Sequence, residues 1–242
     1  MRPVVLLLLL LLVAPPAGLA YEEAAVKNGG SVSGVVRFAG SPPRQETIAV
    51  TRDREVCGDQ RTAHALVVGA DRGVKDSVVM IRGVSRGKRA AGDVTIENSQ
   101  CAFVGRVTGA GPGDRVRVKN ADPILHNPRG TLGGAGVFNL ALPAKGQVID
   151  ITRRLTTPGV VRVTCEAHRH MMGWLVVHDS PYYAVTDERG HFKIDGVPPG
   201  TYTIAMWHEG YRRSGRAKEP VTLTRKVTVA PNGAATIDFE LR

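Results

Sequence analysis

Two-residue alternation of apolar and polar side chains, punctuated by Gly and Pro, recurs along this chain and constrains its fold more than any other feature. The alternation is regular over residues 115–119, and β-branched or apolar runs occupy residues 160–165 and 174–177. A period of two is that of a half-buried strand, and no long 3.6-residue apolar pattern follows residue 20. The sequence therefore predicts an all-β protein.

The amino terminus has the layout of an export signal. Arg2 precedes an apolar run over residues 4–14, and a Pro-Pro-Ala-Gly-Leu-Ala stretch ends at Ala20. The run is about half of the roughly 20 residues needed to span a bilayer. We expect residues 1–20 to be a signal peptide, with a retained membrane anchor as the alternative. The mature chain is then a secreted or periplasmic protein without a transmembrane span.

The odd number of cysteines separates a structural pair from a reactive thiol. An oxidising compartment favours disulfides, so three cysteines leave one unpaired when two are joined. Neither Cys57 nor Cys101 has a metal-ligand residue within a few positions, and we pair them as a hypothetical disulfide. Cys165 remains, and imidazole and thioether groups follow it closely.

The chain is basic, with a formal net charge of +10, of which Arg2 contributes one. Export argues against nucleic acid as the partner of this charge. The Lys and Arg residues are spread along the chain, which favours a solvated basic surface. The alternative is attraction to an acidic protein partner or to an anionic envelope surface.

Candidate metal ligands concentrate in residues 165–172, between two predicted strands. A tight loop can point Cys165, His168 and Met171 into one site, whereas the alternating side chains of a strand cannot converge in this way. Soft sulfur with imidazole selects copper over hard cations, and two His, one Cys and a weak axial Met form the electron-transfer copper arrangement. His126, just after a strong strand, is the candidate for the second imidazole. Zinc is the alternative metal for such a donor set.

The Cys165-x-x-His168-x-x-Met171 spacing, with His126-Asn127 some 39 positions upstream, resembles the copper-binding loop of the plastocyanin, pseudoazurin and amicyanin group of cupredoxins. The resemblance implies a cupredoxin-like Greek-key β-sandwich holding one type 1 (blue) copper ion on these two His, Cys and Met side chains. It also implies that Asn127 bonds to the ligand loop and holds the cysteine in place. His168 is expected to be the ligand at the solvent edge, through which electrons enter or leave.

The ligand loop also departs from the pattern of that group. Arg169 and His170 stand where amicyanin-like loops carry a Pro and an apolar residue. We therefore expect a more basic docking face, suited to an acidic redox partner. His170 and Met172 are possible alternate ligands, and the spacing favours Met171 over Met172 as the axial donor.

A second resemblance covers residues 183–204, which fit the pattern T-D-x-x-G-x-F-x-I-x-x-V-P-x-G-x-Y. It is that of the carboxypeptidase regulatory-like, or transthyretin-like (prealbumin-like), small β-sandwich, whose role is usually structural. We expect a cupredoxin-like copper-binding domain over residues 21–178 and this second sandwich over residues 179–242. Residues 29–93 are either part of the first domain or a separate β subdomain.

These features together predict an exported electron carrier with a redox partner protein, rather than an enzyme. One alternative is a periplasmic copper-handling protein that binds Cu(I) through the sulfur and imidazole groups of residues 165–172. The other is an envelope interaction module that binds no metal.

Overall fold

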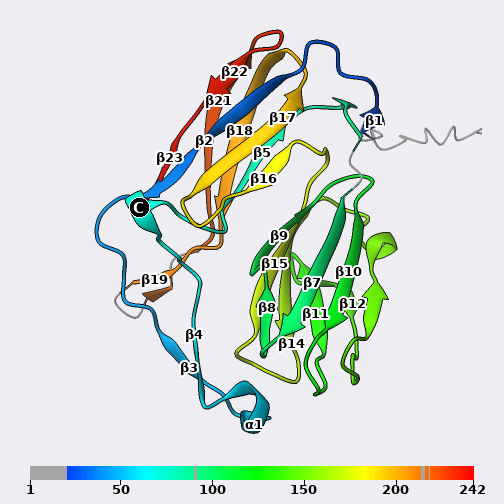
Figure 1. The fold of residues 1–242 in the computed structure, drawn as a ribbon, viewed down its shortest axis with the longest axis vertical. Coiled ribbons are helices and arrows are strands. Elements are labelled where there is room, and N and C mark those ends of the chain that lie inside the picture. Colours follow the sequence, from blue (N-terminus) through cyan, green and yellow to red (C-terminus); the bar gives the residue numbers. More distant parts are fainter. Residues whose placement is uncertain (1–20, 90–91, 214–215, 218) are drawn as a thin grey trace, which may run out of the picture.

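The computed structural model describes residues 21–242 except 90–91, 214–215 and 218, so the expected signal peptide lies outside the described residues. The all-β class is confirmed, because strands dominate the described chain (Figure 1). Its helical elements are the four-residue α1 (Arg54–Cys57) and the 3₁₀ turns η1 (Ala70–Arg72) and η2 (Thr152–Arg154). None of the described helices has the length and apolar character of a membrane span.

The first sandwich consists of two sheets built from the middle of the chain, green in Figure 1. One sheet has the order β13 (Val148–Asp150), β10 (Arg115–Asn120), β7 (Asp93–Ser99) and β8 (Ala102–Val104). The other has the order β12 (Ala135–Asn139), β11 (Pro128–Leu132), β14 (Gly159–Cys165), β15 (Met172–Val177) and β9 (Val107–Ala110).

Alternation along β14 determines where the cysteine points. Val161 and Val163 are buried at 1% exposure each, and Cys165 continues the same face at 3%. Side chains two residues apart lie on one face of a strand, so the thiol enters the core at the end of β14. This core also contains Val116 and Val118 of the facing β10.

The second sandwich also has two sheets. One has the order β16 (Tyr183–Val185), β5 (Val78–Arg82), β18 (Gly200–His208) and β21 (Val221–Val229). The other has the order β17 (His191–Val197), β2 (Gly30–Phe38) and β22 (Ala234–Thr236), and β23 (Phe239–Leu241) also pairs with β2. Its core contains Val32, Ile81 and Phe239.

The second sandwich takes strands from both ends of the chain, which differs from the division expected from the sequence. β2 pairs with β17, and β5 pairs with β18, so strands within residues 29–93 belong with the carboxy-terminal strands. The first sandwich is thus inserted between β5 and β16. Apolar alternation indicates which face of a strand is buried but not which strand lies beside it, so the sequence could not assign β2 and β5.

The two sandwiches meet at an apolar junction. Val78 and Trp207 of the second sandwich pack with Val107 and Val176 of the first. The rings of Trp174 and Trp207 meet edge to face, with centroids 5.5 Å apart. Two short strands, β1 (Glu22–Glu23) and β6 (Arg86–Gly87), pair in parallel.

A long excursion between β2 and Leu66 reaches the end of the first sandwich. We call residues 39–65 the arm, which contains β3 (Thr47–Ala49), α1 and β4 (Gln60–Thr62). The antiparallel pair of β3 and β4 gives the arm its own regular structure. A further short hairpin, β19 (Arg212–Arg213) with β20 (Arg216–Ala217), follows β18.

Candidate metal centre

Three buried side chains at one end of the first sandwich place their donor atoms together. The ligand atoms of His126, Cys165 and His168 all lie within 4.8 Å of one another. Cys165 Sγ is 3.8 Å from Nδ1 of His126 and 3.6 Å from Nδ1 of His168. The three residues are 0%, 3% and 1% exposed. They thus form one compact, buried cluster of potential metal ligands.

Two tight turns in the loop between β14 and β15 explain the three-residue spacing of this motif. The backbone N–H of His168 donates to the carbonyl of Cys165 at 3.3 Å, and that of Met171 donates to the carbonyl of His168 at 3.0 Å. The loop closes where Cys165 N–H donates to the carbonyl of Met171 at 3.4 Å. Each turn returns the chain to the same side, so these residues can share one site.

Asn120 organises the segment that carries His126. Its side-chain amide donates to the carbonyls of Ile124 and Leu142, and its side-chain oxygen accepts from the N–H of Asp122. The backbone of His126 also pairs with Leu142 in an isolated β-bridge. Because Asn120 is fully buried, these bonds hold the loop after β10 in one conformation.

Asn127 contacts the ligand loop through its backbone. Its N–H donates to Cys165 Sγ at 3.3 Å, and its carbonyl accepts from the N–H of Glu166 at 3.0 Å. Its side-chain amide instead donates to the Leu140 carbonyl and to Asn139 Oδ1. Asn127 therefore bonds to the ligand loop and the cysteine through its backbone, while its side chain bonds to residues 139 and 140.

Each of the two imidazoles in the cluster is hydrogen-bonded to a carboxylate through the nitrogen that points away from Cys165. His126 Nε2–H donates to Asp122 Oδ2 at 2.9 Å, and His168 Nε2–H donates to Asp53 Oδ2 at 2.8 Å. A proton on Nε2 leaves the Nδ1 lone pair free, and both Nδ1 atoms face Cys165. Carboxylates in this position fix the tautomer and raise the basicity of a metal-binding imidazole. Neither aspartate was singled out in the sequence.

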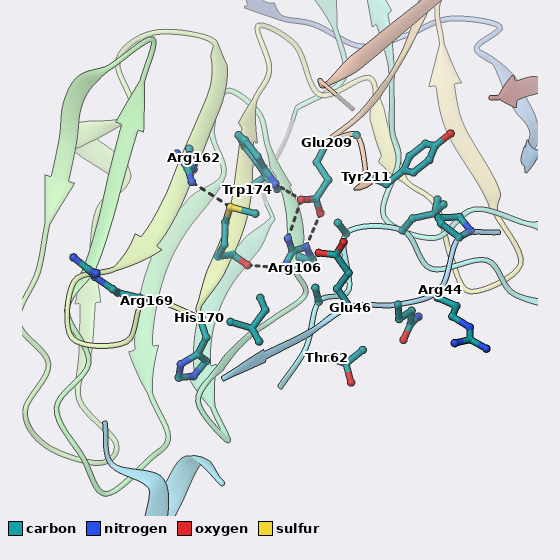
Figure 2. A pocket seen from close by; sticks show the side chains of 18 residues that line it. Arg44, Glu46, Thr62, Arg106, Arg162, Arg169, His170, Trp174, Glu209 and Tyr211 are labelled. Atoms are coloured by element: carbon teal, nitrogen blue, oxygen red, sulfur yellow. Dashed lines mark hydrogen bonds and ion pairs between the residues drawn. The ribbon is translucent and has the colours of Figure 1, made fainter. Parts of the chain in front are cut away.

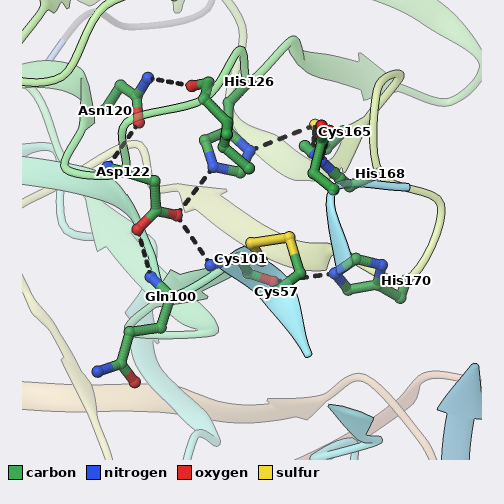
Figure 3. The surroundings of a disulfide bond; sticks show 11 residues. Cys57, Gln100, Cys101, Asn120, Asp122, His126, Cys165, His168 and His170 are labelled. Carbon is green, nitrogen blue, oxygen red and sulfur yellow. Dashed lines mark hydrogen bonds and ion pairs between the residues drawn. A yellow bond between two sulfur atoms is a disulfide. The ribbon is translucent and has the colours of Figure 1, made fainter. Parts of the chain in front are cut away.

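The expectation that His168 lies at the solvent edge is wrong. The residue is 1% exposed, because the arm covers its Nε2 edge with Asp53. The arm is fixed there by a disulfide between Cys57 and Cys101, with an S–S distance of 2.01 Å (Figure 3). This is the pairing predicted from the odd cysteine count, and it joins the arm to the first sandwich. A chain segment 115 residues upstream of His168 thus takes the place of solvent.

The disulfide also connects to the carboxylate behind His126. Asp122 accepts hydrogen bonds from the backbone N–H groups of Gln100 and Cys101, at 2.7 and 2.8 Å (Figure 3). Asp122, Cys101 and His126 also lie close enough to form a metal-binding group. Cys101 cannot serve as its thiolate, because its sulfur is bonded to Cys57.

Burial determines the protonation preferences of the donors. It raises the pKa of the Cys165 thiol, which the N–H of Asn127 only partly offsets. Burial also lowers the pKa of His126, against the opposing effect of Asp122. Desolvation alone would raise the pKa of Asp122, but its bonds from Cys101, His126 and Gln100 bring that pKa below its ordinary value. The free cluster is therefore a neutral thiol beside a neutral His126.

The remaining loop candidates lie in different places. Met171 is 2% exposed and packs in the same core cluster as Cys165. Met172 is the first residue of β15, and its sulfur accepts a hydrogen bond from Arg162 at 3.6 Å. His170 Nε2–H donates to the carbonyl of Cys101 at 3.2 Å. Each of the two possible alternate ligands thus already contacts another group.

One family is recognised in the sequence. Residues 145–242 match the model of the carboxypeptidase regulatory-like domain. The carboxy-terminal part of the chain is thus similar to a carboxypeptidase regulatory-like domain. In the structure, the sandwich that contains this domain also uses β2 and β5, while the matched residues begin within the first sandwich, ahead of β13. Of the matched residues, β13, β14 and β15 pair within the first sandwich, whereas β16, β17, β18, β21, β22 and β23 pair within the second.

Solved structures of copper proteins resemble part of the chain. A reduced Cu(I) amicyanin variant at pH 4 shares 20% identity over 41% of this chain and 98% of its own, with a TM-score of 0.31. A purple cupredoxin from Nitrosopumilus maritimus shares 20% identity over 36% of this chain and 99% of its own, with a TM-score of 0.30. A copper-containing nitrite reductase from Thermus scotoductus SA-01 shares 23% identity over 36% of this chain and 22% of its own, with a TM-score of 0.31. No curated protein sequence matches the chain.

The structure places two aspartates, Asp122 and Asp53, against the imidazoles of the candidate centre, and the sequence gives a hint of only the first. Asp122 lies four residues before His126, in a loop of the same domain, so an Asp-x-x-x-His pattern could have drawn attention to it. Asp53 lies outside the carboxypeptidase regulatory-like domain and far from every ligand in sequence. Only the folded path of the arm reveals its role.

Proposed function

We propose that this protein binds one copper ion through His126, Cys165 and His168, with Met171 as a weak axial donor, and carries single electrons. The observation that supports this most is the buried convergence, within 4.8 Å, of one thiol and one ligand atom from each of two imidazoles. The donors come from different segments of the first sandwich, so the fold brings them together.

The chemistry of the donor set suits copper. A thiolate with two imidazoles and a nearby thioether is the ligand set of electron-transfer copper sites, whereas hard cations require oxygen donors. Cys165, His126, His168 and Met171 are all buried, which leaves these side chains shielded from bulk solvent. Copper bound there would supply a one-electron couple between Cu(II) and Cu(I).

The surrounding residues would hold this set rigid. Asn127 N–H directs the sulfur, while Asp122 and Asp53 orient the two imidazoles. A donor set fixed by such outer hydrogen bonds keeps its geometry when its charge changes. The proposed role is therefore that of a carrier, because the burial of all donors favours electron exchange over direct contact with a substrate.

The edge of His168 is the proposed point of exchange, by way of Asp53. The side chain of Asp53 is 34% exposed, whereas that of His168 is fully buried. Asp53 thus lies between the imidazole and solvent. An electron would pass between a docked redox partner and the centre across this short hydrogen-bonded contact.

Export to the periplasm or beyond is also proposed. The Cys57–Cys101 disulfide supports this, because such bonds persist in oxidising compartments. The basic charge of the chain and the exposed Arg169 near the centre suit an acidic redox partner protein.

Cyclic voltammetry of the copper-loaded protein tests the proposal. We expect one reversible one-electron wave, which Cys165→Ser removes while the far-ultraviolet circular dichroism stays unchanged. Met172→Leu serves as the matched control, because its sulfur contacts Arg162, and it should keep the wave. Bound copper without a wave would contradict electron transfer. Cu(I) binding that survives Cys165→Ser but is lost on Met172→Leu would indicate copper handling through the alternate ligands.

A further inference from the structure

A cleft of about 590 Å³ lies beside the candidate metal centre, between the arm and the two sandwiches (Figure 2). The arm contributes Arg44 and Ile48, the first sandwich contributes Arg162 and Trp174, and Tyr211 closes it from the second sandwich. This volume falls within the range of about 300–1,000 Å³ that is typical of small-molecule sites.

Three arginines of the cleft lack a carboxylate partner. Within the described part of the chain, no salt bridge involves Arg44, Arg162 or Arg169. Figure 2 shows Arg162 and Arg169 on one side of the cleft and Arg44 on the other. A guanidinium group carries its charge at every physiological pH and binds carboxylates in a fork-like geometry. The cleft therefore offers unneutralised donors for an anion.

Four arginines and two glutamates line the cleft, so the acidic residues leave positive charge in excess. Glu209 binds Arg106 through both carboxylate oxygens, at 2.5 and 2.8 Å, and accepts from Trp174 Nε1 at 2.9 Å. The Arg106–Glu209 pair is neutral as a unit and forms part of the junction.

Apolar side chains supply the remaining walls. Ile48 is 40% exposed, which is unusual for a large aliphatic side chain, and it faces the same space as Leu66, Met172 and Trp174. Apolar surface left in water costs about 25 cal/mol per Å² relative to burial, so an apolar ligand body would be favoured here.

We propose that this cleft binds a small organic anion, a carboxylate with an apolar or aromatic body. The anionic group would be held by the arginines and the body by Ile48 and Trp174. His170 also lines the cleft, and its ring centroid is 5.7 Å from that of His168. The ligand would therefore lie near the metal centre, but its binding needs no metal. This inference goes beyond the proposed function and can fail or succeed independently of it.

Isothermal titration calorimetry on the metal-free protein tests the inference with three probes. The probes are 2-naphthoate, its neutral analogue 2-naphthamide, and inorganic phosphate. We expect 2-naphthoate to bind at least about tenfold more tightly than either of the others, because only it combines an anionic group with an apolar body.

Variants then locate the site. Arg44→Gln and Arg162→Gln should each weaken 2-naphthoate about tenfold, the usual effect of losing one charge-assisted hydrogen bond. Arg153→Gln is the matched control, since it removes the same charge at an exposed position on η2, outside the cleft, and should leave binding unchanged. Ala63→Trp places a large ring in the cleft and should abolish binding.

Several results would overturn the inference. Equal binding of 2-naphthamide would show that the arginines do not select an anion, and equal binding of phosphate would show that the apolar walls do not contribute. Unchanged 2-naphthoate affinity in both the Arg44→Gln and Ala63→Trp variants, with the circular dichroism of wild type, would place any binding elsewhere.

Discussion

The end of the first sandwich that carries the candidate metal centre, which we call the metal end, and the junction between the sandwiches both bury imidazoles, but the hydrogen-bond partners of these imidazoles differ. His126 and His168 each donate from Nε2 to an aspartate. His208, at the junction, is equally buried, and no carboxylate of the described residues pairs with it. Its Nδ1 accepts from the N–H of Gly210, and Arg106 lies nearby.

The hydrogen-bond partner of each imidazole thus determines which ring nitrogen is left free. An aspartate on Nε2 aims the opposite nitrogen, so His126 and His168 point their Nδ1 atoms at one thiol. Burial beside a cation instead keeps His208 neutral, with its pKa lowered to about 4. Burial alone therefore does not distinguish these imidazoles, whereas the aspartate on Nε2 does.

The first prediction breaks the covalent tie of the metal end while leaving the junction intact. Replacing both Cys57 and Cys101 by Ser removes a cross-link that spans 44 residues. Loop-closure entropy then predicts a loss of about 4 kcal/mol in the free energy of unfolding. Urea unfolding of the metal-free protein measures it.

The same variant should uncover His168, because the arm is no longer fixed over it. Modification by diethyl pyrocarbonate, mapped by mass spectrometry, should increase at His168 and stay unchanged at His208. Equal protection of His168 in both proteins would show that the arm stays closed without its disulfide.

The second prediction breaks the junction while leaving the metal end intact. Glu209→Gln leaves Arg106 without its anion, and the two side chains are only 4% and 16% exposed. Removing one partner of such a buried pair should cost about 3 kcal/mol of stability. Glu240→Gln is the matched control, because the Glu240–Arg242 pair is exposed and should contribute less than about 1 kcal/mol. Similar urea midpoints for the two variants would argue against a buried ion pair at the junction.

The third prediction concerns acid stability. Unfolding returns His208 from a pKa of about 4 to its ordinary 6.5, so the unfolded chain binds the extra proton below pH 6.5. Stability should therefore fall as the pH decreases through this window and be unaffected above it. Between about pH 7 and pH 5 we expect His208 to account for about 2 kcal/mol of this loss.

Urea unfolding at several pH values, for wild type and His208→Gln, isolates this contribution. The variant should lose about 2 kcal/mol less over the window. His191→Gln changes an exposed histidine and should follow the wild-type profile. Parallel profiles for wild type and His208→Gln would contradict the burial of a neutral imidazole at the junction.

The fourth prediction compares the two aspartates within the metal end. Asp122 has an 8% exposed side chain and accepts three hydrogen bonds, whereas the side chain of Asp53 is 34% exposed. Asp122→Asn should therefore cost about 2 kcal/mol of stability, and Asp53→Asn about 0.5 kcal/mol. The order of the two urea midpoints decides this, and a larger loss for Asp53→Asn would reverse the account of which aspartate is structural.

Local patterns made much of the molecule predictable. The all-β class followed from two-residue alternation, and the convergence of Cys165 and His168 followed from their spacing in a short loop. The Cys57–Cys101 pair followed from counting thiols, because only Cys165 had other donor groups close behind it. In each case the deciding residues are neighbours in sequence or form a small closed set.

Long-range contacts were not predictable in the same way. β2 lies more than 150 residues before β17, its partner in the second sandwich, and alternation in each strand is satisfied by many pairings. The burial of His168 depends on Asp53, 115 residues away in an arm with little pattern of its own. A polar segment that covers a site has no apolar periodicity to reveal it.

The visible absorption spectrum of the protein loaded with Cu(II) tests the central claim most directly. A short copper–thiolate bond from Cys165 in a trigonal site would give intense visible absorption, so we predict a blue or green protein. Cys165→Ser should abolish the colour, while His208→Gln, which alters an equally buried imidazole at the junction, should retain it. A colourless wild-type protein with one bound Cu(II) ion would contradict the assignment of His126, Cys165 and His168 as an electron-transfer copper site.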